Sequence, residues 1–209
     1  MTIDRSGYPF IGGTAALGIA AALTVGAAGA VPLFVLAAFF LYFFRDPDRV
    51  SPQDPSLVLS PADGRVLVAG PADPAAAPPG DWKQISIFLS PIDVHVNRSP
   101  VSGRVTKVDF RKGKFLPAYH RDAAAANERS EVWVDHGGVH VVFRQIVGIL
   151  ARRVVCRVQP GSQLKAGERF GIMKFGSRMD VFLPANAELK VSIGDAVVGG
   201  VTVIAVLIR

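Results

Sequence analysis

The sequence has a single cysteine, Cys156, among its 209 residues. One cysteine excludes an intramolecular disulfide and cannot form a metal cluster by itself, so a small buried thiol is the expected role. Charged residues are also scarce: they make up 19% of the chain, against 50% hydrophobic residues. This balance excludes a disordered chain and a nucleic-acid-binding tail. The sequence therefore predicts a folded protein with an additional apolar segment.

No residue from 9 to 44 is charged, whereas one crossing of a bilayer needs only about 20 apolar residues. The stretch is therefore too long for one upright helix. Residues 10–30 are rich in glycine and alanine, and residues 33–44 are dense in leucine and phenylalanine. Because small residues let helix backbones approach closely in lipid, we expect a helical hairpin that turns near Gly29 to Pro32. The short second segment leaves a re-entrant hairpin or a single tilted helix as alternatives.

A secretory signal peptide is the main alternative for this stretch, since residues 26–30 are small enough to imitate a cleavage site. A signal core should not be followed by a second apolar block, so we expect an uncleaved membrane anchor over residues 1–49. Arg5 precedes the apolar stretch, and Arg45 and Arg49 follow it, which suits a hairpin with both ends in the cytoplasm. The predicted location is the cell inner membrane, with the remaining domain on the cytoplasmic side.

The charges of residues 1–49 cancel, so the net charge of +6 lies on residues 50–209. A basic domain beside an apolar anchor predicts an anionic partner surface, and acidic lipid headgroups are the nearest candidate. A generic basic surface explains the charge equally well.

Residues 50–209 predict one mainly β, antiparallel domain. Short apolar stretches are separated by Gly, Pro and Asp, and none shows a sustained helical period. Two further segments, 73–80 and 112–130, are expected to be loops, and the second is long enough to be functional. The expected strands are 84–89, 103–110, 132–134, 139–145, 153–158, 180–183, 188–191 and 201–208.

Residues 159–168 and 185–200 have the strand, turn, strand cadence of lipoyl- and biotinyl-type barrels. Two similar turns predict a β-sandwich or barrel. This fold class fits an enzyme, a membrane-anchored carrier module or an efflux-adaptor domain. In the carrier alternative, Met173 and Lys174 would form part of a biotin-accepting turn, although Phe175 does not belong in such a turn.

A Gly-Ser dipeptide at Gly176–Ser177 directly precedes a predicted strand, and a second one occurs at Gly161–Ser162. Glycine lacks a Cβ, so its carbonyl is accessible and its backbone tolerates strain. A serine hydroxyl in this position can attack the preceding carbonyl and convert the amide to an ester. Elimination and hydrolysis would then leave an N-terminal pyruvoyl group, an electrophile made from the chain itself.

Five short motifs follow one another along the sequence. They are Phe44-Arg45-Asp46-Pro47, Ser60-Pro61-Ala62-Asp63-Gly64, Ser90-Pro91-Ile92-Asp93-Val94-His95-Val96-Asn97-Arg98, Asn127-Glu128-Arg129 and Phe175-Gly176-Ser177. In their order and spacing the sequence resembles the phosphatidylserine decarboxylases, and in particular their short, membrane-anchored subgroup. The resemblance runs from about residue 44 to the C-terminus, and ordered motifs are far more specific together than singly. It implies self-cleavage between Gly176 and Ser177 into a membrane-bound β chain, residues 1–176, and an α chain, residues 177–209.

The resemblance also implies roles for individual residues. Ser177 would be the nucleophile and pyruvoyl precursor, activated by Asp63 and a histidine in a triad-like arrangement. Longer members of the family carry two histidines where this chain has His95 and Arg98. Either His95 serves both cleavage and decarboxylation, or Arg98 or Asp93 replaces the second histidine in one step. Arg98 and Asp93 are also candidate substrate-binding residues, and Arg98 could meet the lipid phosphate.

The implied reaction converts phosphatidylserine to phosphatidylethanolamine through a Schiff base between the pyruvoyl group and the substrate amine. The pyruvoyl group is then the only cofactor, and neither pyridoxal phosphate nor a metal is needed. The expected partners are the phospholipid substrate, the membrane and the two cleaved chains as a heterodimer, with a homodimer of these plausible and no nucleic acid. A decarboxylase of a soluble amino acid is a further alternative, which the anchor disfavours.

His136 and His140 are separated by Gly137 and Gly138, which predict a hairpin turn, so we expect no metal site at this pair.

Overall fold

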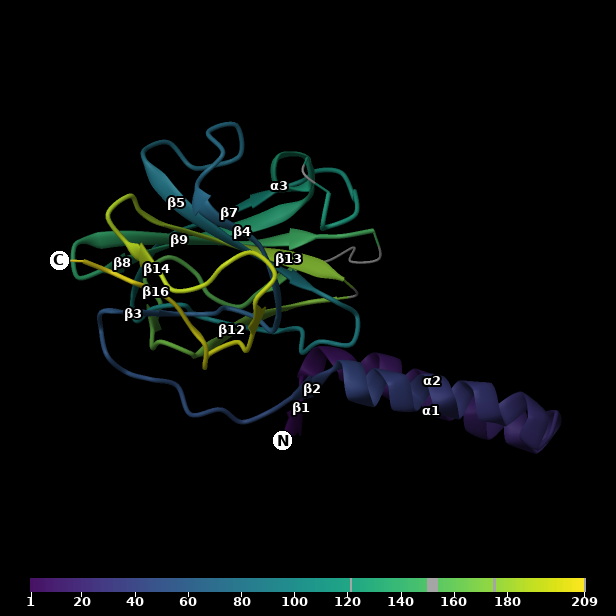
Figure 1. Cartoon of the computed structure of the whole chain (residues 1–209). Coiled ribbons are helices and arrows are strands. Elements are labelled where there is room, and N and C mark those ends of the chain that lie inside the picture. The colour runs from purple at the N-terminus through teal and green to yellow at the C-terminus, as the bar shows by residue number, and fades with distance from the viewer. Residues whose placement is uncertain (121, 150–153, 175, 209) are drawn as a thin grey trace. The chain divides into compact units, whose positions relative to one another are not determined.

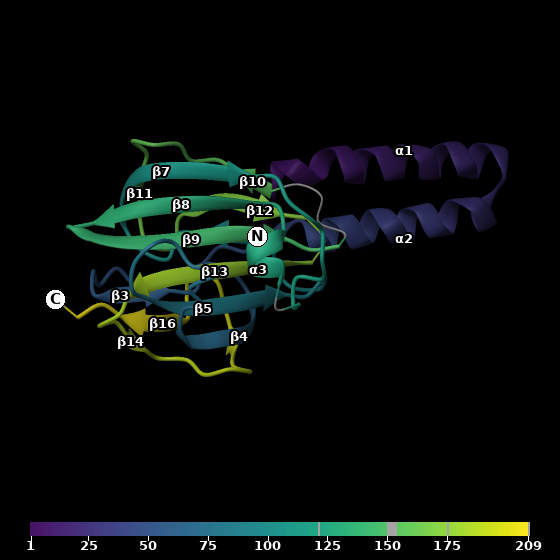
Figure 2. The ribbon, with the colours of Figure 1, turned by 90° about the horizontal axis from the view of Figure 1, so that it is seen from above.

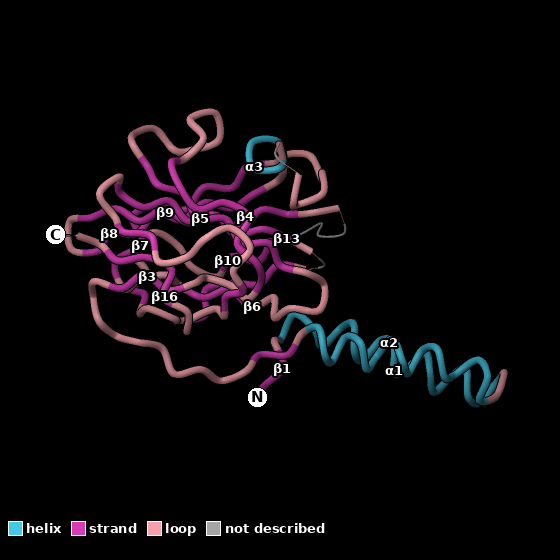
Figure 3. The backbone as a smooth tube through the Cα atoms, viewed as in Figure 1, coloured by secondary structure: helices cyan, strands magenta, loops and turns pink. Residues whose placement is uncertain are grey.

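The computed structural model describes residues 1–120, 122–149, 154–174 and 176–208, which divide into two compact units, Met1–Asp48 and Arg49–Arg209 (Figure 1). Phe175 of the predicted cleavage motif and the first residue of the predicted strand 153–158 lie outside the described residues. Helices are confined almost entirely to the first unit and strands dominate the second (Figure 3).

The first unit is built on two apolar helices, α1 (Tyr8–Thr24) and α2 (Ala27–Phe43). A short 3-10 turn, η1 (Arg5–Gly7), precedes α1, and two-residue strands β1 (Thr2–Ile3) and β2 (Arg45–Asp46) pair at the base. The segment Arg5–Thr24 is long and apolar enough to cross a membrane, whereas α2 is a shorter apolar helix. Large apolar side chains on their surface face outward, among them Leu23 at 83% exposure.

The turn between the helices lies at Val25 and Gly26, so the prediction of a turn near Gly29 to Pro32 is wrong. Gly26 adopts a φ of +88°, a left-handed conformation that favours glycine, and this reverses the chain. Pro32 lies inside the early part of α2, where its missing N–H removes only one hydrogen bond of the helix. The helices pack closely where Gly18 faces the ring of Phe34.

The second unit is organised around an eight-stranded antiparallel sheet in the order β11-β7-β8-β9-β13-β5-β4-β15. Figure 2 shows β7, β8, β9, β13 and β5 side by side in this sheet. Its strands are β11 (Gln163–Leu164), β7 (Gly103–Arg111), β8 (Arg129–His136), β9 (Val139–Val147), β13 (Ser177–Pro184), β5 (Trp82–Leu89), β4 (Gly64–Pro71) and β15 (Ala196–Val197).

Two three-stranded antiparallel sheets accompany the large sheet. Their strands are β10 (Val154–Cys156), β12 (Arg169–Met173) and β6 (Val96–Arg98) in one, and β14 (Glu188–Leu189), β16 (Val203–Val206) and β3 (Leu57–Leu59) in the other. One further short helix, α3 (Ala123–Ala126), lies in the loop between β7 and β8.

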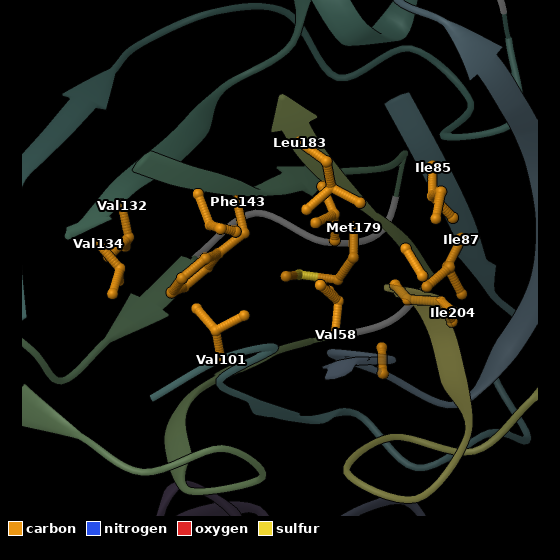
Figure 4. Close-up of a cluster of buried hydrophobic side chains, with 14 of the residues drawn as sticks. Val58, Ile85, Ile87, Val101, Val132, Val134, Phe143, Met179, Leu183 and Ile204 are labelled. Atoms are coloured by element: carbon orange, nitrogen blue, oxygen red, sulfur yellow. The ribbon is translucent and has the colours of Figure 1, made fainter. Parts of the chain in front are cut away.

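The main core lies between one face of the large sheet and the small sheets. Figure 4 shows Met179 and Ile87 of the large sheet close to Val58 of β3 and Ile204 of β16. Because strand side chains alternate, Met179 and its alternate neighbours along β13 face this core, while Arg178 and Asp180 face the opposite side. Full burial of an apolar side chain of this size contributes about 1.5–3 kcal/mol, so the core fixes the register of β13 and the position of its first residue.

The predicted fold class is confirmed: the domain is mainly β and antiparallel, and apolar helices precede it. The strands that flank the Gly194–Asp195 turn, β14 and β15, do not pair with each other but join two different sheets. The chain therefore has the predicted order of strand, turn and strand here, but the two strands do not form a hairpin.

Candidate active site

Ser177 is the first residue of β13, where three strand ends meet. It is paired with Val147, the last residue of β9, on one side and with Leu89, the last residue of β5, on the other. The side chain is fully buried, and among the described residues its Oγ has no hydrogen-bond partner. A buried hydroxyl without a partner is energetically unfavourable, and such groups concentrate at catalytic sites and sites of strain.

Gly176 precedes Ser177 in the chain and is in contact with His95. Gly176 has a φ of +74°, and its N–H donates to Nε2 of His95 at 3.3 Å. Nδ1 of the same fully buried ring lies 2.9 Å from the carbonyl oxygen of Asp93. Since that carbonyl can only accept, Nδ1 carries the proton and Nε2 is the nitrogen that accepts from Gly176, the residue before Ser177. The structure thus brings together three of the predicted site residues.

The structure separates the two Gly-Ser dipeptides, which the sequence alone leaves equivalent in kind. Gly161 also has a positive φ, of +94°. The Oγ of Ser162, however, is only half-buried and accepts a hydrogen bond from the N–H of Gln159 at 3.1 Å. Of the two serines, only Ser177 is fully buried with a hydroxyl that has no hydrogen-bond partner among the described residues. Only its preceding glycine donates to an imidazole nitrogen.

Asp63 forms an ion pair with Arg49, which was not among the predicted site residues. Nη1 and Nη2 of Arg49 donate to its two carboxylate oxygens at 2.5 and 2.7 Å, and the N–H of Gly199 donates to Oδ1 at 2.8 Å. Both side chains are largely buried, at 10% and 18% exposure. A bidentate arginine pair of this kind fixes the carboxylate in one orientation. The hydrogen bonds of Asp63 thus go to Arg49 and Gly199, and not to Ser177 or His95.

Asp63 and Asp93 line the same cleft, which has a volume of about 540 Å³. Its wall includes the exposed side chain of Ile92 and the ring of Phe88. The carboxylate of Asp93 accepts from the N–H of Ser90 at 2.7 Å and so holds the turn that carries His95. The cleft therefore combines two carboxylates with apolar walls, next to the loop of the candidate base.

Arg98 lies in a different depression. Its Nη1 donates to the carbonyl oxygen of Gly167 at 3.0 Å, and its side chain is buried. With Arg49, Lys165 and Arg169 it lines an open cleft of about 790 Å³. The excess of basic side chains makes this cleft suited to an anionic group. Arg49 connects the two clefts, because it lines this one and pairs with Asp63 in the other.

The Asn127-Glu128-Arg129 motif holds the long loop between β7 and β8 against the sheet. The buried Asn127 side chain accepts from the N–H of Leu116 at 2.9 Å and donates to the carbonyl oxygens of Leu116 and Val147, both at 2.8 Å. Nη1 of Arg129 donates to the carbonyl oxygens of Ala124 and Ala125. The sequence motif identified these residues, and their contacts show that they hold the loop in place.

Beneath this loop lies a layer of buried charge on the outer face of the sheet. Arg178 pairs with Asp180 at 2.6 Å, and Arg144 pairs with Glu131 at 2.5 Å. Burial lowers the pKa of the Arg129 guanidinium, and the nearby positive charge of Arg144 lowers it further. Ser177 points to the other face of β13, so this layer supports the site from behind.

His136 and His140 lie on either side of a tight turn, and their rings have different surroundings. Both ring nitrogens of His136 lie beside carbonyl oxygens, those of Ser102 at 2.6 Å and Pro55 at 2.7 Å, and the side chain of His140 is exposed. Gly137 and Gly138 both have positive φ and form the turn between β8 and β9. Within the described part of the chain, no three His, Cys, Asp or Glu side chains are grouped to hold a metal ion.

This combination, a buried serine after a left-handed glycine with an imidazole beside the peptide, is that expected of a self-processing proenzyme. Comparison with known proteins agrees. Residues 36–205 match the phosphatidylserine decarboxylase family model. A phosphatidylserine decarboxylase proenzyme of Symbiobacterium thermophilum is 45% identical over 203 residues, covering 97% of this chain and 94% of that protein. One of Desulfotalea psychrophila is 39% identical over 207 residues, covering 99% and 97%.

The chain therefore belongs to the phosphatidylserine decarboxylase family, as its motifs predicted.

Proposed function

We propose that this protein is a membrane-anchored decarboxylase that converts phosphatidylserine to phosphatidylethanolamine after cleaving itself between Gly176 and Ser177. The family and the proenzyme names of its relatives support the substrate and the processing. The observation that carries the proposal is the buried Ser177 hydroxyl, without a partner among the described residues, next to a left-handed glycine whose N–H meets His95.

In the proposed cleavage, Oγ of Ser177 attacks the carbonyl carbon of Gly176 and its proton passes to a base. The C–N bond between the two residues breaks, the Ser177 nitrogen takes up a proton, and an ester replaces the amide. Removal of the Ser177 α-proton then expels the Gly176 carboxylate and leaves dehydroalanine. Addition of water and loss of ammonia convert this residue to an N-terminal pyruvoyl group. His95 is the proposed base, because its Nε2 accepts from the N–H of Gly176, the residue whose carbonyl carbon is attacked.

The residues at the strand ends fit a pyruvoyl group derived from Ser177. This position is fully buried, and the register of β13 with β5 and β9 holds it on both sides. The group would supply an electron-accepting carbonyl for the substrate amine, including the Schiff base that the family resemblance implies. His95 would then move the proton at the substrate α-carbon, because its ring contacts the residue that precedes position 177. The clefts lined by Asp63 and Asp93 and by Arg98 offer the carboxylate and basic surroundings for the headgroup.

We also propose that the two cleaved chains remain together as a heterodimer. The α chain, residues 177–209, would contribute β13 to the centre of the large sheet, between β5 and β9 of the β chain. Separation would break both hydrogen-bonded ladders and expose the core residues Met179 and Leu183. We further propose that two such heterodimers associate as a homodimer, which is an expectation from the sequence alone.

The apolar helices would anchor the protein in the cell inner membrane, with residues 50–209 in the cytoplasm. The outward-facing apolar side chains of α1 and α2 support the anchor. Arg5, Arg45 and Arg49 flank the helices and support the cytoplasmic side. An anchor suits a substrate that resides in the bilayer.

The proposal is tested by comparing Ser177→Ala with Ser162→Ala in purified full-length protein in lipid vesicles that contain phosphatidylserine. Ser162 is the matched control because it belongs to the other Gly-Ser dipeptide, whose glycine also has a positive φ. We expect Ser177→Ala to remain one chain and release no carbon dioxide, while Ser162→Ala is cleaved and active like the parent. Free serine as a second substrate distinguishes the soluble amino acid alternative. Cleavage and activity in Ser177→Ala would falsify the proposal.

A further inference from the structure

Gly148 directly follows β9 and lies across from the proposed cleavage site. Val147 and Ser177 are partners in the β9–β13 ladder, so the next residue outward on each strand is Gly148 and Gly176. Gly148 is buried, and it is not among the described glycines with positive φ. Its own backbone conformation is therefore open to any residue, and another feature must explain why glycine is needed here.

The space around Gly148 gives that explanation. A Cβ built on Gly148 would overlap the carbonyl oxygen of Gly176, and it would lie 3.3 Å from both the carbonyl carbon of Gly176 and the Cβ of Ala118. The obstacle is backbone rather than the end of a flexible side chain, so the overlap cannot be relieved by a rotamer change. The carbonyl that overlaps is the one attacked in the proposed cleavage.

Gly176 is thus held at both ends. Its N–H donates to Nε2 of His95, and its carbonyl oxygen occupies the space that a side chain at position 148 would need. The β9 side of this contact is fixed, since the N–H of Val147 donates to the carbonyl oxygen of Glu128 and its own carbonyl accepts from Asn127. A side chain at position 148 would therefore displace Gly176 rather than β9.

We infer that Gly148 is a positioning residue for the self-cleavage reaction: its missing side chain allows the scissile carbonyl to lie where the Ser177 hydroxyl can attack it. The inference depends on the proposed cleavage between Gly176 and Ser177. Attack requires a near-contact distance and an aligned approach, and a displacement of about 1 Å at a reacting group can lower a rate about 100-fold. Gly148→Ala should therefore slow cleavage roughly 10- to 100-fold.

After cleavage the requirement disappears. Gly176 becomes the free C-terminal residue of the β chain, and its carboxylate can move away from position 148. Decarboxylation per cleaved molecule should then be close to that of the parent. A general loss of folding would instead lower both rates together, so the ratio of the two rates separates a positioning role from a structural one.

The matched control is Gly171→Ala. Gly171 is also buried, also lacks a positive φ, and a Cβ there would overlap a backbone carbonyl oxygen, that of Val155 in the neighbouring strand β10. It imposes the same kind of clash within the same domain, but not on the scissile peptide. The folded fraction of each variant is measured in a Ser177→Ala background, where no cleavage occurs.

The experiment follows cleavage of newly translated full-length protein in phosphatidylserine-containing nanodiscs by gel and intact mass, and then carbon dioxide release per cleaved chain. We expect slow cleavage but near-parent turnover for Gly148→Ala, and parent-like cleavage per folded molecule for Gly171→Ala. Parent-like cleavage by Gly148→Ala, or an equal loss in Gly171→Ala, would overturn the inference. An uncleaved parent protein would instead overturn the proposed function.

A second variant keeps the test decisive if Gly148→Ala does not fold. Ala118→Val narrows the same space from the loop side, because the Cβ of Ala118 lies beside the position that a Gly148 side chain would take. We expect slower cleavage and unchanged turnover in this variant too. Parent-like cleavage by folded Ala118→Val would then count against the inference.

Discussion

Replacing Asn127 by alanine is expected to loosen the loop between β7 and β8 and to lower the stability of the β domain measurably. The substitution removes three hydrogen bonds, one accepted from the Leu116 N–H and two donated to the carbonyl oxygens of Leu116 and Val147. Each such bond contributes a net of about 0.5–1.5 kcal/mol, and a partner left buried without a bond adds to the loss. We expect the free energy of unfolding to fall by about 2–4 kcal/mol.

For a domain of this size, 1 kcal/mol changes the midpoint of thermal unfolding by about 2–4 °C, so the expected decrease is roughly 5–15 °C. Trp82 and Trp133 lie edge to face within the large sheet, with ring centroids 5.9 Å apart, and their fluorescence reports the transition. The measurement uses full-length protein in detergent in the Ser177→Ala background, so that every sample is a single chain. Asn186→Ala is the matched control, since among the described residues its side chain makes one hydrogen bond, to the carbonyl oxygen of Ile208, and this bond is exposed. Its loss should lower the free energy of unfolding by less than about 0.5 kcal/mol. Equal midpoints for the two asparagine variants would refute the role assigned to Asn127.

Three further predictions concern the site and its surroundings. His95→Gln should slow cleavage by about 10²- to 10⁴-fold in a time course of chain separation, because Nε2 is then no longer basic; a parent-like rate would exclude His95 as the base. Asp63→Asn and Arg49→Gln should each lower the unfolding free energy, and in a double-mutant cycle their combined loss should be smaller than the sum by about 1 kcal/mol or more; additive losses would mean that the pair contributes no coupling. Burial raises the pKa of the Cys156 thiol, so the reactive thiolate is scarce at neutral pH, and iodoacetamide should label the native protein more slowly than the urea-unfolded protein, at a rate that rises with pH beyond the usual thiol range. Equal labelling rates in the two states would contradict this assignment.

Much of the fold was predictable because its signals are local. The uncharged stretch predicts the apolar helices. Alternating apolar residues bounded by glycine and proline predict strands such as β5, β9 and β13. The turn at Gly26 was misplaced because Pro32 is the stronger sequence signal for a break, whereas a left-handed glycine is recognised only from its φ. The strand β4 was missed because Gly64, Gly70 and Pro71 resemble a loop, and its pairing with β5 decides its conformation.

The candidate site was predictable only as far as its chemistry is written in residue types. Serine after glycine and a histidine in a recurring motif identified Ser177 and His95. Their proximity, however, depends on which strand ends meet at β13. Arg49 and Gly148 carried no chemical signal at all, since one belongs with the charges that flank the anchor and the other is one of 21 glycines. Both were found from contacts between residues far apart in the sequence, which no local pattern encodes.

The central claim is that Ser177 ceases to be a serine when the protein matures, and the mass of the purified protein tests it most directly. Intact mass spectrometry of full-length protein from membranes should show two chains, residues 1–176 and residues 177–209, with the smaller one blocked at its N-terminus by a pyruvoyl group. Reduction with borohydride in the presence of phosphatidylserine should attach the lipid to the smaller chain alone. An active preparation that consists of one unbroken chain with an intact Ser177 would contradict the account.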